Sequence, residues 1–386
     1  MRNLKTTPKI SIVIPAFNAE YWIARTINSV LSQTLQDLEI IVIDDGSTDG
    51  TRNIVEAIKD NRIQYHYQEN RGLSGARNSG ILASTGRFIA LLDADDLFKP
   101  KKLAYQVELM EKEPDLGLVT CGIELIDQYD NHIGEERHWL FHPTIDLDHL
   151  LFWNPLLPST LLIRREWFER VGLFDESLRR YEDWEFPIRL AAAGCRMEYV
   201  REILVSYRRH TVNMSSAVEL VHVATDDAVR MITSFFERED IPEHTQELKE
   251  KVMGNVYLDA TARAYEAGLL DEGRKWLETA IAFDPDLTSG DPPQWVIGLS
   301  GFAQGPLVDD EEVFTKTLMT NLPQSPEFKN WTIREFKTQM NVTKAFEMFF
   351  AGQRSKARWY AIIAIVSDLS LILRNHGLLV IGFRPW

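Results

Sequence analysis

The chain has 386 residues, of which 45% are hydrophobic, and its formal net charge is −15 at pH 7. This length and composition fit a folded protein of two or three domains, because a domain usually holds about 100 to 200 residues. The acidic balance argues against a broad nucleic-acid-binding surface, which needs clustered Lys and Arg. The two cysteines have no Cys-x-x-Cys spacing, so they predict neither a zinc site nor a disulfide framework and favour a reducing compartment.

The amino-terminal residues 1–9 lead into an apolar run without the apolar core of a signal peptide. No run of about 18 uncharged apolar residues occurs, so we expect no membrane-spanning helix. Residues 359–373 come nearest, but Asp368 interrupts them. We interpret them as a buried helix, with contact at a membrane surface as the lesser alternative. A cytoplasmic protein is expected, and peripheral attachment to the inner face of a membrane is left open.

The first 120 residues alternate short β-branched or aromatic runs with segments whose apolar residues have helical spacing. The expected strands are residues 10–14, 38–43, 63–67 and 88–92. The first helix is expected to begin near Asn18 and the second near Ser47 or Thr48, because these residues are good N-caps. The alternation is typical of an α/β fold with a mostly parallel sheet covered by helices.

Between residues 116 and 207 the pattern becomes less regular. Further strands are expected at residues 117–121, 159–163 and 203–207. The intervening residues 127–158 are rich in His, Trp, Pro and Asp, and we interpret them either as a wall of an acceptor site or as an ordinary surface loop. Beyond about residue 215 the chain is expected to be helical. We therefore predict one domain over residues 1–215 and a helical region over residues 216–386.

The helical region contains two segments in which small and large residues alternate as in a helix–turn–helix repeat. They lie near residues 255–285 and 340–370, and the second follows the first by 84 residues. The corresponding pairs are Gly268 and Gly352, Trp276 and Tyr360, and Ala280 and Ala364. Both segments resemble tetratricopeptide helical pairs, in which small residues let the helices approach. Because two copies are too few for a self-supporting solenoid, we expect an appendage that packs on the first domain or on a partner.

Residues 38–50 are the most informative part of the sequence, since a buried apolar run ends abruptly in two carboxylates and a turn. In an open α/β sheet, ligands bind beyond the carboxyl ends of the strands. The Asp45 carboxylate can accept two hydrogen bonds in one plane, which suits a nucleobase edge or a ribose diol. The alternative is a carboxylate that caps the following helix.

Residues 88–96 repeat this construction, with an apolar run that ends in Asp93, Ala94, Asp95 and Asp96. Alternate residues of an extended segment point the same way, so Asp93 and Asp95 are expected to share a face while Asp96 points elsewhere. Two hard oxygen donors suit Mg²⁺ or Mn²⁺ that is held largely by the phosphates of a substrate. A solvated turn is the alternative, although like charges beside a buried strand repel one another unless a cation intervenes.

A third acidic group, residues 181–185, is expected to open a helix that ends at residues 193–194. It contains Asp183 next to Trp184, and a carboxylate at a helix start beside Trp can be held rigidly and partly desolvated, as a general base requires. The alternative is a set of first-turn acids that interact favourably with the helix dipole.

Together these motifs resemble glycosyltransferase family 2 with the GT-A fold. The matching segments are SIVIPAFN (11–18), DDGSTD (44–49), NRGLSGARNSG (70–80), DADD (93–96), and GLFDE (172–176) through the acids at 182–183. Their order, spacing and flanking strands agree over about residues 9–215. The resemblance implies a nucleotide-diphospho-sugar transferase fold, that is, a Rossmann-like, mostly parallel sheet with flanking helices. It says nothing about the helical region.

The resemblance also implies roles for residues around the nucleotide. Pro15, Phe17 and Asn18 match the loop that closes around the nucleotide. Asp45 matches the acid that reads the nucleobase, and Arg77 matches the basic residue near the nucleotide.

Further roles concern the reaction centre. By the same resemblance, Asp93 would face the ribose and the donor sugar, and Asp95, the second acid of the Asp-x-Asp motif, would ligate the metal. Asp183 matches the general base that deprotonates the acceptor hydroxyl. His210 occupies a place where related enzymes often have a His near the metal or diphosphate, and the basic pair 208–209 could neutralise the leaving group. A basic surface cluster is the alternative.

The resemblance implies an inverting transferase that uses Mn²⁺ or Mg²⁺ and moves a sugar from a nucleotide-sugar donor to an acceptor hydroxyl. UDP-sugars are expected first, with GDP- and dTDP-sugars behind them. The acceptor could be a glycan, as in polysaccharide biosynthesis, a lipid-linked sugar, a protein or a small metabolite. The Gln-x-x-Arg-Trp segment of processive synthases is not found, so a non-processive enzyme is expected.

Other classes of function remain to be compared with this one. A dinucleotide-dependent oxidoreductase would carry Gly-x-Gly-x-x-Gly after the first strand, where this chain has Pro-Ala-Phe-Asn instead. A nucleotidyltransferase could share the sheet and the acids. A nucleotide-binding scaffold could recruit partners through the helical region, which is also open to membrane contact, protein contact or homodimer formation.

Overall fold

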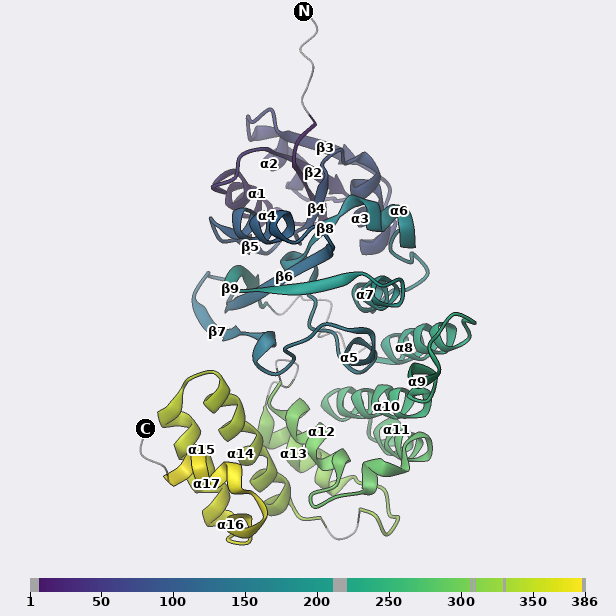
Figure 1. Ribbon diagram of the computed structural model, residues 1–386, viewed down its shortest axis with the longest axis vertical. Coiled ribbons are helices and arrows are strands. Elements are labelled where there is room, and N and C mark those ends of the chain that lie inside the picture. Colours follow the sequence, from purple (N-terminus) through teal and green to yellow (C-terminus); the bar gives the residue numbers. More distant parts are fainter. Residues whose placement is uncertain (1–6, 211–220, 306–307, 309, 329–330, 384–386) are drawn as a thin grey trace, which may run out of the picture. The chain divides into compact units, whose positions relative to one another are not determined.

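The computed structural model describes residues 7–210, 221–305, 308, 310–328 and 331–383. The chain divides into two compact units, Met1–Thr211 and Val212–Trp386. The predicted boundary between residues 215 and 216 falls within residues 211–220, outside the described residues. Figure 1 shows an α/β first unit and a helical second unit.

The first unit contains one mixed sheet. Its strands are β1 (Ile10–Ala16), β2 (Leu38–Asp44), β3 (Ile63–Tyr67), β4 (Phe88–Leu91), β5 (Leu97–Phe98), β6 (Leu116–Ile126), β7 (His132–Glu136), β8 (Leu162–Arg164) and β9 (Arg196–Arg208). The order is β3-β2-β1-β4-β8-β6-β9-β5, with β7 paired to β6. The first four strands of this order are parallel, whereas β8 runs antiparallel to both of its neighbours. The sheet is therefore parallel where the predicted nucleotide loops leave it.

The strands predicted in the first 120 residues are confirmed, and each of their ends lies within two residues of its expected position. The strands predicted at residues 117–121 and 203–207 are parts of the longer β6 and β9. The strand predicted at residues 159–163 begins only at Leu162, because Pro158–Thr160 form a 3₁₀ turn, η2.

Seven α-helices accompany this sheet in the described part of the first unit. They are α1 (Ile23–Leu31), α2 (Thr51–Ala57), α3 (Gly72–Ala83), α4 (Lys102–Lys112), α5 (Leu147–Phe152), α6 (Arg165–Val171) and α7 (Glu182–Ala192). The helix starts predicted near Asn18 and near Ser47 or Thr48 are wrong. Asn18 has a φ of 49°, which is outside the helical region, and Asp49 Oδ1 accepts the hydrogen bond from Thr51 N at 3.0 Å.

Strand alternation fills both faces of the sheet. Ile12, Ile14 and Val42 belong to a core shared with buried residues of α1 and α4, whereas Ile41 and Ile43 pack on α3. Side chains alternate between the faces of a strand, so each apolar run supplies both layers. In Figure 1, α1 and α4 accordingly lie on the opposite side of the sheet from α3.

Residues 127–158 contain more regular structure than a loop. They include β7, α5 and a second 3₁₀ turn, His138–Leu140. In this segment His142 stacks on Trp153, with ring centroids 3.8 Å apart. The segment is therefore folded and is not an irregular surface loop. Its role at an acceptor site stays a prediction.

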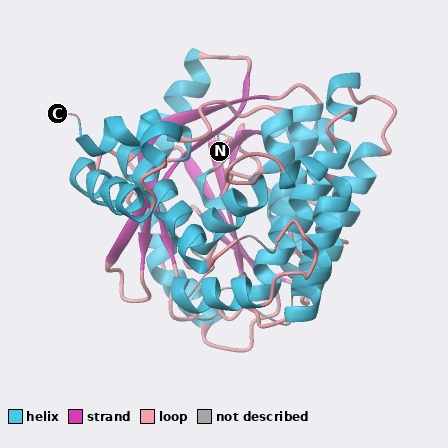
Figure 2. Ribbon diagram, turned by 90° about the horizontal axis from the view of Figure 1, so that it is seen from below, coloured by secondary structure: helices cyan, strands magenta, loops and turns pink. Residues whose placement is uncertain are grey.

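The second unit is built from helices. They are α8 (Val221–Phe236), α9 (Glu243–Gln246), α10 (Lys249–Glu266), α11 (Leu270–Phe283), α12 (Gln294–Ala303), α13 (Glu311–Thr320), α14 (Ile333–Phe350), α15 (Arg354–Ser367), α16 (Leu371–Arg374) and α17 (His376–Phe383). All of the named strands, which are magenta in Figure 2, belong to the first unit. None of the helices in the described part of the chain combines the length and the apolarity needed to cross a membrane.

The two predicted helical pairs are present as α10 with α11 and α14 with α15. Every boundary of the second pair follows the matching boundary of the first by 84 residues. Gly268 and Gly352 occupy the two turns, and both have a φ of 75°. Glycine adopts this left-handed conformation without the steric penalty of a Cβ atom, so both pairs turn in the same way.

The prediction that residues 359–373 form one buried helix is wrong, because α15 ends at Ser367, α16 begins at Leu371, and most of the segment is not buried. Ala361 and Ala364 are buried, but Trp359 is 64% exposed and Leu373 is 82% exposed. The segment is apolar on opposite faces, and burial of one face leaves the other at the surface.

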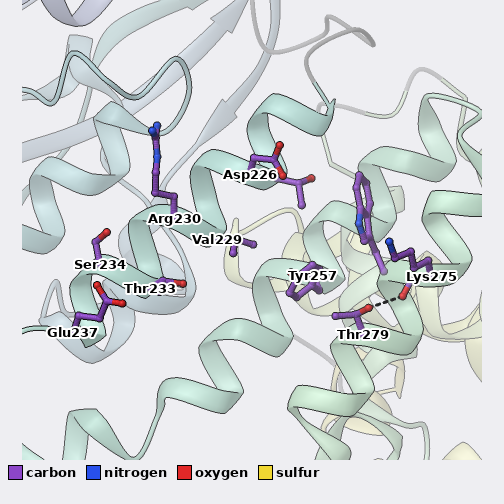
Figure 3. Close-up of a pocket in the computed structure, with 11 residues that line it drawn as sticks. Asp226, Val229, Arg230, Thr233, Ser234, Glu237, Tyr257, Lys275 and Thr279 are labelled. Atoms are coloured by element: carbon purple, nitrogen blue, oxygen red, sulfur yellow. Dashed lines mark hydrogen bonds between the residues drawn. The ribbon is translucent and has the colours of Figure 1, made fainter.

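A pocket of about 540 Å³ lies among α8, α10 and α11. Figure 3 shows the lining side chains, among them Tyr257 and the polar residues Thr233, Glu237 and Lys275. None of the predicted site residues lines this pocket.

Gly80 is a point of close approach between α3 and the sheet. A Cβ atom at Gly80 would overlap Val13 Cγ1 and would lie 3.2 Å from Ile43 Cγ1. Gly80→Ala is therefore expected to lower the free energy of unfolding by about 1–3 kcal/mol, as overpacking usually does. Urea unfolding followed by circular dichroism measures this change.

The matched control is Gly301→Ala in α12, where a Cβ atom would meet nothing within 4 Å. This change should be neutral or stabilising, because alanine is the better helix residue. Equal effects of the two substitutions would show that α3 does not pack as closely as described.

Candidate active site

The loops after β1 and β2 are joined by hydrogen bonds at the carboxyl ends of these strands. Asn18 N donates to Ser47 Oγ at 2.9 Å, and Thr48 N donates to Asn18 Oδ1 at 2.9 Å. Pro15 is buried within β1, whereas the neighbouring Phe17 is 54% exposed. Of the three residues predicted in the nucleotide loop, Phe17 thus presents its ring to solvent and Asn18 holds the loops together.

Asp45 is buried and lies against the start of α3. Its Oδ1 accepts hydrogen bonds from Gln68 Nε2 at 2.6 Å and from Arg71 N at 2.9 Å, and its Oδ2 accepts one from Gly72 N at 2.9 Å. The alternative, in which Asp45 caps the helix that follows it, is wrong. The Asp45 carboxylate accepts hydrogen bonds from the start of α3 and not from α2. A carboxylate has about four acceptor positions, so Asp45 can accept a further hydrogen bond from a ligand.

Asp96 lies beneath the other acids of the Asp93–Asp96 group. Its carboxylate is 1% exposed and accepts hydrogen bonds from Ser159 Oγ at 2.6 Å and Arg208 N at 2.9 Å. Burial, followed by the nearby charges of Asp95 and Asp93, raises the pKa of Asp96 well above its usual value. Ser159 Oγ also accepts a hydrogen bond from Asp93 N at 3.1 Å. Asp96 therefore points into the protein, and Ser159 fixes the strand end.

Asp95 and His210 lie side by side, although 115 residues separate them in the sequence. Asp95 Oδ2 is 2.9 Å from His210 Nε2, and the His210 ring stacks on Trp22 with centroids 5.6 Å apart. The Arg208 guanidinium lies 4.5 Å from the centre of the Trp22 ring. The two predicted metal ligands are thus together, and an aromatic ring from the start of α1 supports them.

Arg77 connects the end of β4 to the start of α7. Its side chain is 1% exposed, and its terminal nitrogens donate to Asp93 Oδ1 at 2.9 Å and Glu182 Oε1 at 2.7 Å. Burial disfavours the charged guanidinium, but the two carboxylates outweigh it and raise the Arg77 pKa further. In this conformation Arg77 is an internal brace, whereas the resemblance to the family implies a basic residue near the nucleotide.

Asp183 lies in the first turn of α7, beside Glu182. Burial, followed by the Glu182 and Asp93 charges, raises the pKa of Asp183 to about 7, although Arg77 and Arg180 oppose the shift. Its backbone is held where Asn154 Nδ2 donates to Asp183 O at 3.1 Å. A carboxylate with this pKa can take up a proton near neutral pH, as general bases do.

The sequence did not identify Glu182 and Ser159 as parts of the site. Glu182 belongs to the predicted acidic helix start, but nothing in the spacing pairs it with Arg77. Ser159 lies 63 residues after Asp96 and in an η2 turn that was predicted as strand. Only the tertiary arrangement reveals these two contacts.

The protein donors for a divalent cation are few. In the described residues no three His, Cys, Asp or Glu side chains converge as a metal site. Asp95 and His210 offer one oxygen and one nitrogen donor at the surface of the acidic group. This set fits Mg²⁺ or Mn²⁺, which are commonly held by one or two protein ligands together with substrate phosphates.

Known proteins resemble this chain in sequence. The profile described as "Glycosyl transferase family 2" matches residues 11–172. An uncharacterized glycosyltransferase of Rickettsia typhi is 34% identical over 216 residues, which are 54% of this chain and 67% of the relative. Another, from Nostoc, is 34% identical over 228 residues, which are 54% of this chain and 68% of the relative.

A solved structure shares the fold. TarS 1–349 of S. aureus, solved in complex with UDP-GlcNAc, has a TM-score of 0.53 and 20% sequence identity, and the likeness covers 89% of this chain and 92% of TarS 1–349. The mixed sheet with its flanking helices is thus the GT-A fold that the motifs predicted. The relatives and the family profile together show that this chain is an enzyme of glycosyltransferase family 2.

Proposed function

We propose that this enzyme transfers a sugar from a nucleoside diphosphate donor to an acceptor hydroxyl with inversion at the anomeric carbon. The observation that carries the proposal is the Arg77 brace, which brings Asp93 and the start of α7 together. The expected donor-side acid and the expected base, Asp183, consequently belong to one connected charge network. A direct displacement needs such proximity, because the acceptor must attack opposite the departing diphosphate.

Asp183 is proposed as the general base. Its raised pKa makes it a stronger proton acceptor than an ordinary carboxylate, while a large fraction remains ionised near pH 7. The attacking acceptor oxygen forms the new bond to the anomeric carbon as its proton passes to Asp183. The bond from that carbon to the diphosphate breaks, and its electron pair leaves with the nucleoside diphosphate.

On the donor side, Asp45 is proposed to contact the nucleobase through its remaining acceptor position, and Phe17 to contact the nucleotide. Asp93 is proposed to face the ribose and the donor sugar. Asp95 and His210 are proposed to hold Mn²⁺ or Mg²⁺, which when bound offsets the charge of the departing diphosphate. The UDP-GlcNAc bound to TarS makes UDP-sugars the first donors to test, before GDP- and dTDP-sugars.

The acceptor is proposed to be a hydroxyl of a glycan, a lipid-linked sugar or another glycoconjugate, and the transfer to be non-processive. Release of a nucleoside diphosphate distinguishes this reaction from nucleotidyl transfer, which releases pyrophosphate. Turnover also distinguishes it from nucleotide binding by a scaffold.

Asp183→Asn removes the proposed base and keeps the size of the side chain. We expect release of nucleoside diphosphate from the accepted nucleotide-sugar to fall by about 10²- to 10⁴-fold, the usual contribution of one positioned base. Nucleotide affinity, measured by calorimetry, should be unchanged. Loss of nucleotide binding in this variant would contradict the assignment.

The same variant tests how the raised pKa of Asp183 affects the stability of the protein. Because folding raises the carboxyl pKa from 3.8 to about 7, the stabilising effect of the protonated form is lost as the pH rises through 7. Asp183→Asn should therefore melt at a higher temperature than the native protein at pH 8, and not at pH 4.

The pH dependence of the reaction tests the state of Asp183. Only the ionised carboxylate accepts a proton, so kcat/KM should rise about tenfold per pH unit below pH 7 and level off above it. The charged groups around Asp183 are Glu182, Arg77, Asp93 and Arg180. A profile that is already flat from pH 5 upward would assign the base to a group with an ordinary carboxyl pKa.

Metal and nucleotide should bind cooperatively, because Asp95 and His210 are the two proposed ligands among the described residues and the diphosphate would complete the coordination. In thermal unfolding, Mn²⁺ alone is expected to give a small shift, whereas UDP with Mn²⁺ gives a large one. Binding at one hundred times the dissociation constant adds about 2.7 kcal/mol to stability.

Asp95→Asn should abolish the cooperative part of this shift and leave the shift with UDP alone. Glu327→Gln serves as the control, because Glu327 lies in the second unit. Equal shifts with UDP in the presence of Mn²⁺ or of chelator would contradict a metal role for Asp95.

A further inference from the structure

Residues 359–373 of the second unit, from α15 to α16, carry several exposed apolar side chains, and we call this segment the apolar ridge. Five of its large apolar side chains are exposed: Trp359 (64%), Val366 (70%), Leu369 (69%), Ile372 (39%) and Leu373 (82%). Large exposed apolar patches usually mark interaction sites, because water contact with such surface is unfavourable. We therefore infer that the ridge is an interaction site.

The part of the ridge on α15 occupies one face of the helix. Trp359 and Val366 are seven residues apart, and the partly exposed Ile362 and Ile363 fall between them at helical spacing. The opposite face, which includes Ala357 and Ala364, is buried in a core that α15 shares with α14, α16 and α17. Packing within the unit thus accounts for only one of the two apolar faces of α15.

Positive charge borders the ridge. Residues 354–358 contain Arg354, Lys356 and Arg358, and from residue 354 to residue 374 the sole acid is Asp368. Asp368 forms an ion pair with Arg374 at 2.6 Å, and Arg374 also pairs with Asp291. A basic border around apolar side chains is conspicuous in a chain whose net charge is −15.

The ridge has the composition of an interfacial surface and not of a spanning one. The α15 helix has 14 residues, which is shorter than the roughly 20 that a spanning helix needs. Trp is favoured at membrane interfaces because its ring is apolar and its N–H is polar. Lys and Arg beside an apolar helix face attract anionic headgroups while the apolar side chains enter the acyl boundary.

We propose that the apolar ridge binds the surface of an anionic lipid bilayer. Trp359, Val366 and Leu373 enter the interfacial region, and the basic residues 354–358 contact the headgroups. This inference goes beyond the proposed function, since it concerns where the second unit binds and not which sugar the first unit transfers. A bilayer is favoured over a second copy of the chain because anionic lipid complements the basic border. In a dimer formed through the ridge, the basic borders of the two copies would face each other and repel.

The test is flotation of the full chain with vesicles. The vesicles are made of phosphatidylcholine alone or of phosphatidylcholine with about one third phosphatidylglycerol, a strongly anionic surface. The native protein should float with the anionic vesicles, and high salt should weaken the binding through screening. Absence of flotation, or equal flotation with both vesicles, would overturn the proposal.

Variants identify the surface. The double substitution Trp359→Gln and Leu373→Gln removes two exposed side chains and should reduce vesicle binding at least about tenfold, because less apolar area enters the interface. Lys356→Glu should reduce binding only to the anionic vesicles. Val313→Gln in α13 is the matched control, since Val313 is also exposed, at 60%, and lies outside the ridge.

Two further measurements make each outcome decisive. Circular dichroism and unchanged nucleoside diphosphate release confirm that each variant is folded. Light scattering without vesicles measures the oligomeric state. If the native protein is a dimer, and the double substitution converts it to a monomer without altering vesicle binding, the ridge is a dimer interface. That result would overturn the proposal. Vesicle binding that is lost equally in Val313→Gln would likewise overturn it.

Discussion

The buried guanidinium of Arg77 is the interaction on which the arrangement of the site depends. A cation at 1% exposure is tolerated only because Asp93 and Glu182 both accept its hydrogen bonds. Asp93 follows the fourth strand, and Glu182 begins α7, so one side chain fixes two segments far apart in sequence. Loss of one member of such a buried pair typically costs about 3–5 kcal/mol, and the geometry of the acids is correspondingly well defined.

The same electrostatic network produces two kinds of carboxylate. Asp96 is buried, hydrogen bonded to Ser159 and supports the strand end, whereas Asp93 and Asp95 remain partly exposed above it. Asp183 differs from both kinds, because burial and neighbouring acids raise its pKa to about 7. Neighbouring acids thus differ in burial and in pKa, as expected when desolvation and like charges act together.

Sequence reasoning predicted the strands of the first half and the two helical pairs because both depend on local periodicity. It misplaced the first two helix starts, since Asn18 and Ser47 hydrogen bond across loops and do not cap their own helices. It identified the acids but not their partners, because the contacts of Arg77 with Glu182 and of Ser159 with Asp96 span long stretches of chain. It also treated α15 as buried, since composition cannot tell which of two apolar faces finds a partner.

We propose that acids from three separated segments form one site for a nucleotide-sugar. A crystal structure of the enzyme with UDP and Mn²⁺ tests it most directly. We expect the metal to lie between Asp95 and the diphosphate, with Asp183 facing the position of the donor sugar and the Arg77 brace intact. Nucleotide bound away from Asp45 and Asp95, for example in the pocket lined by Tyr257 and Trp276, would contradict it.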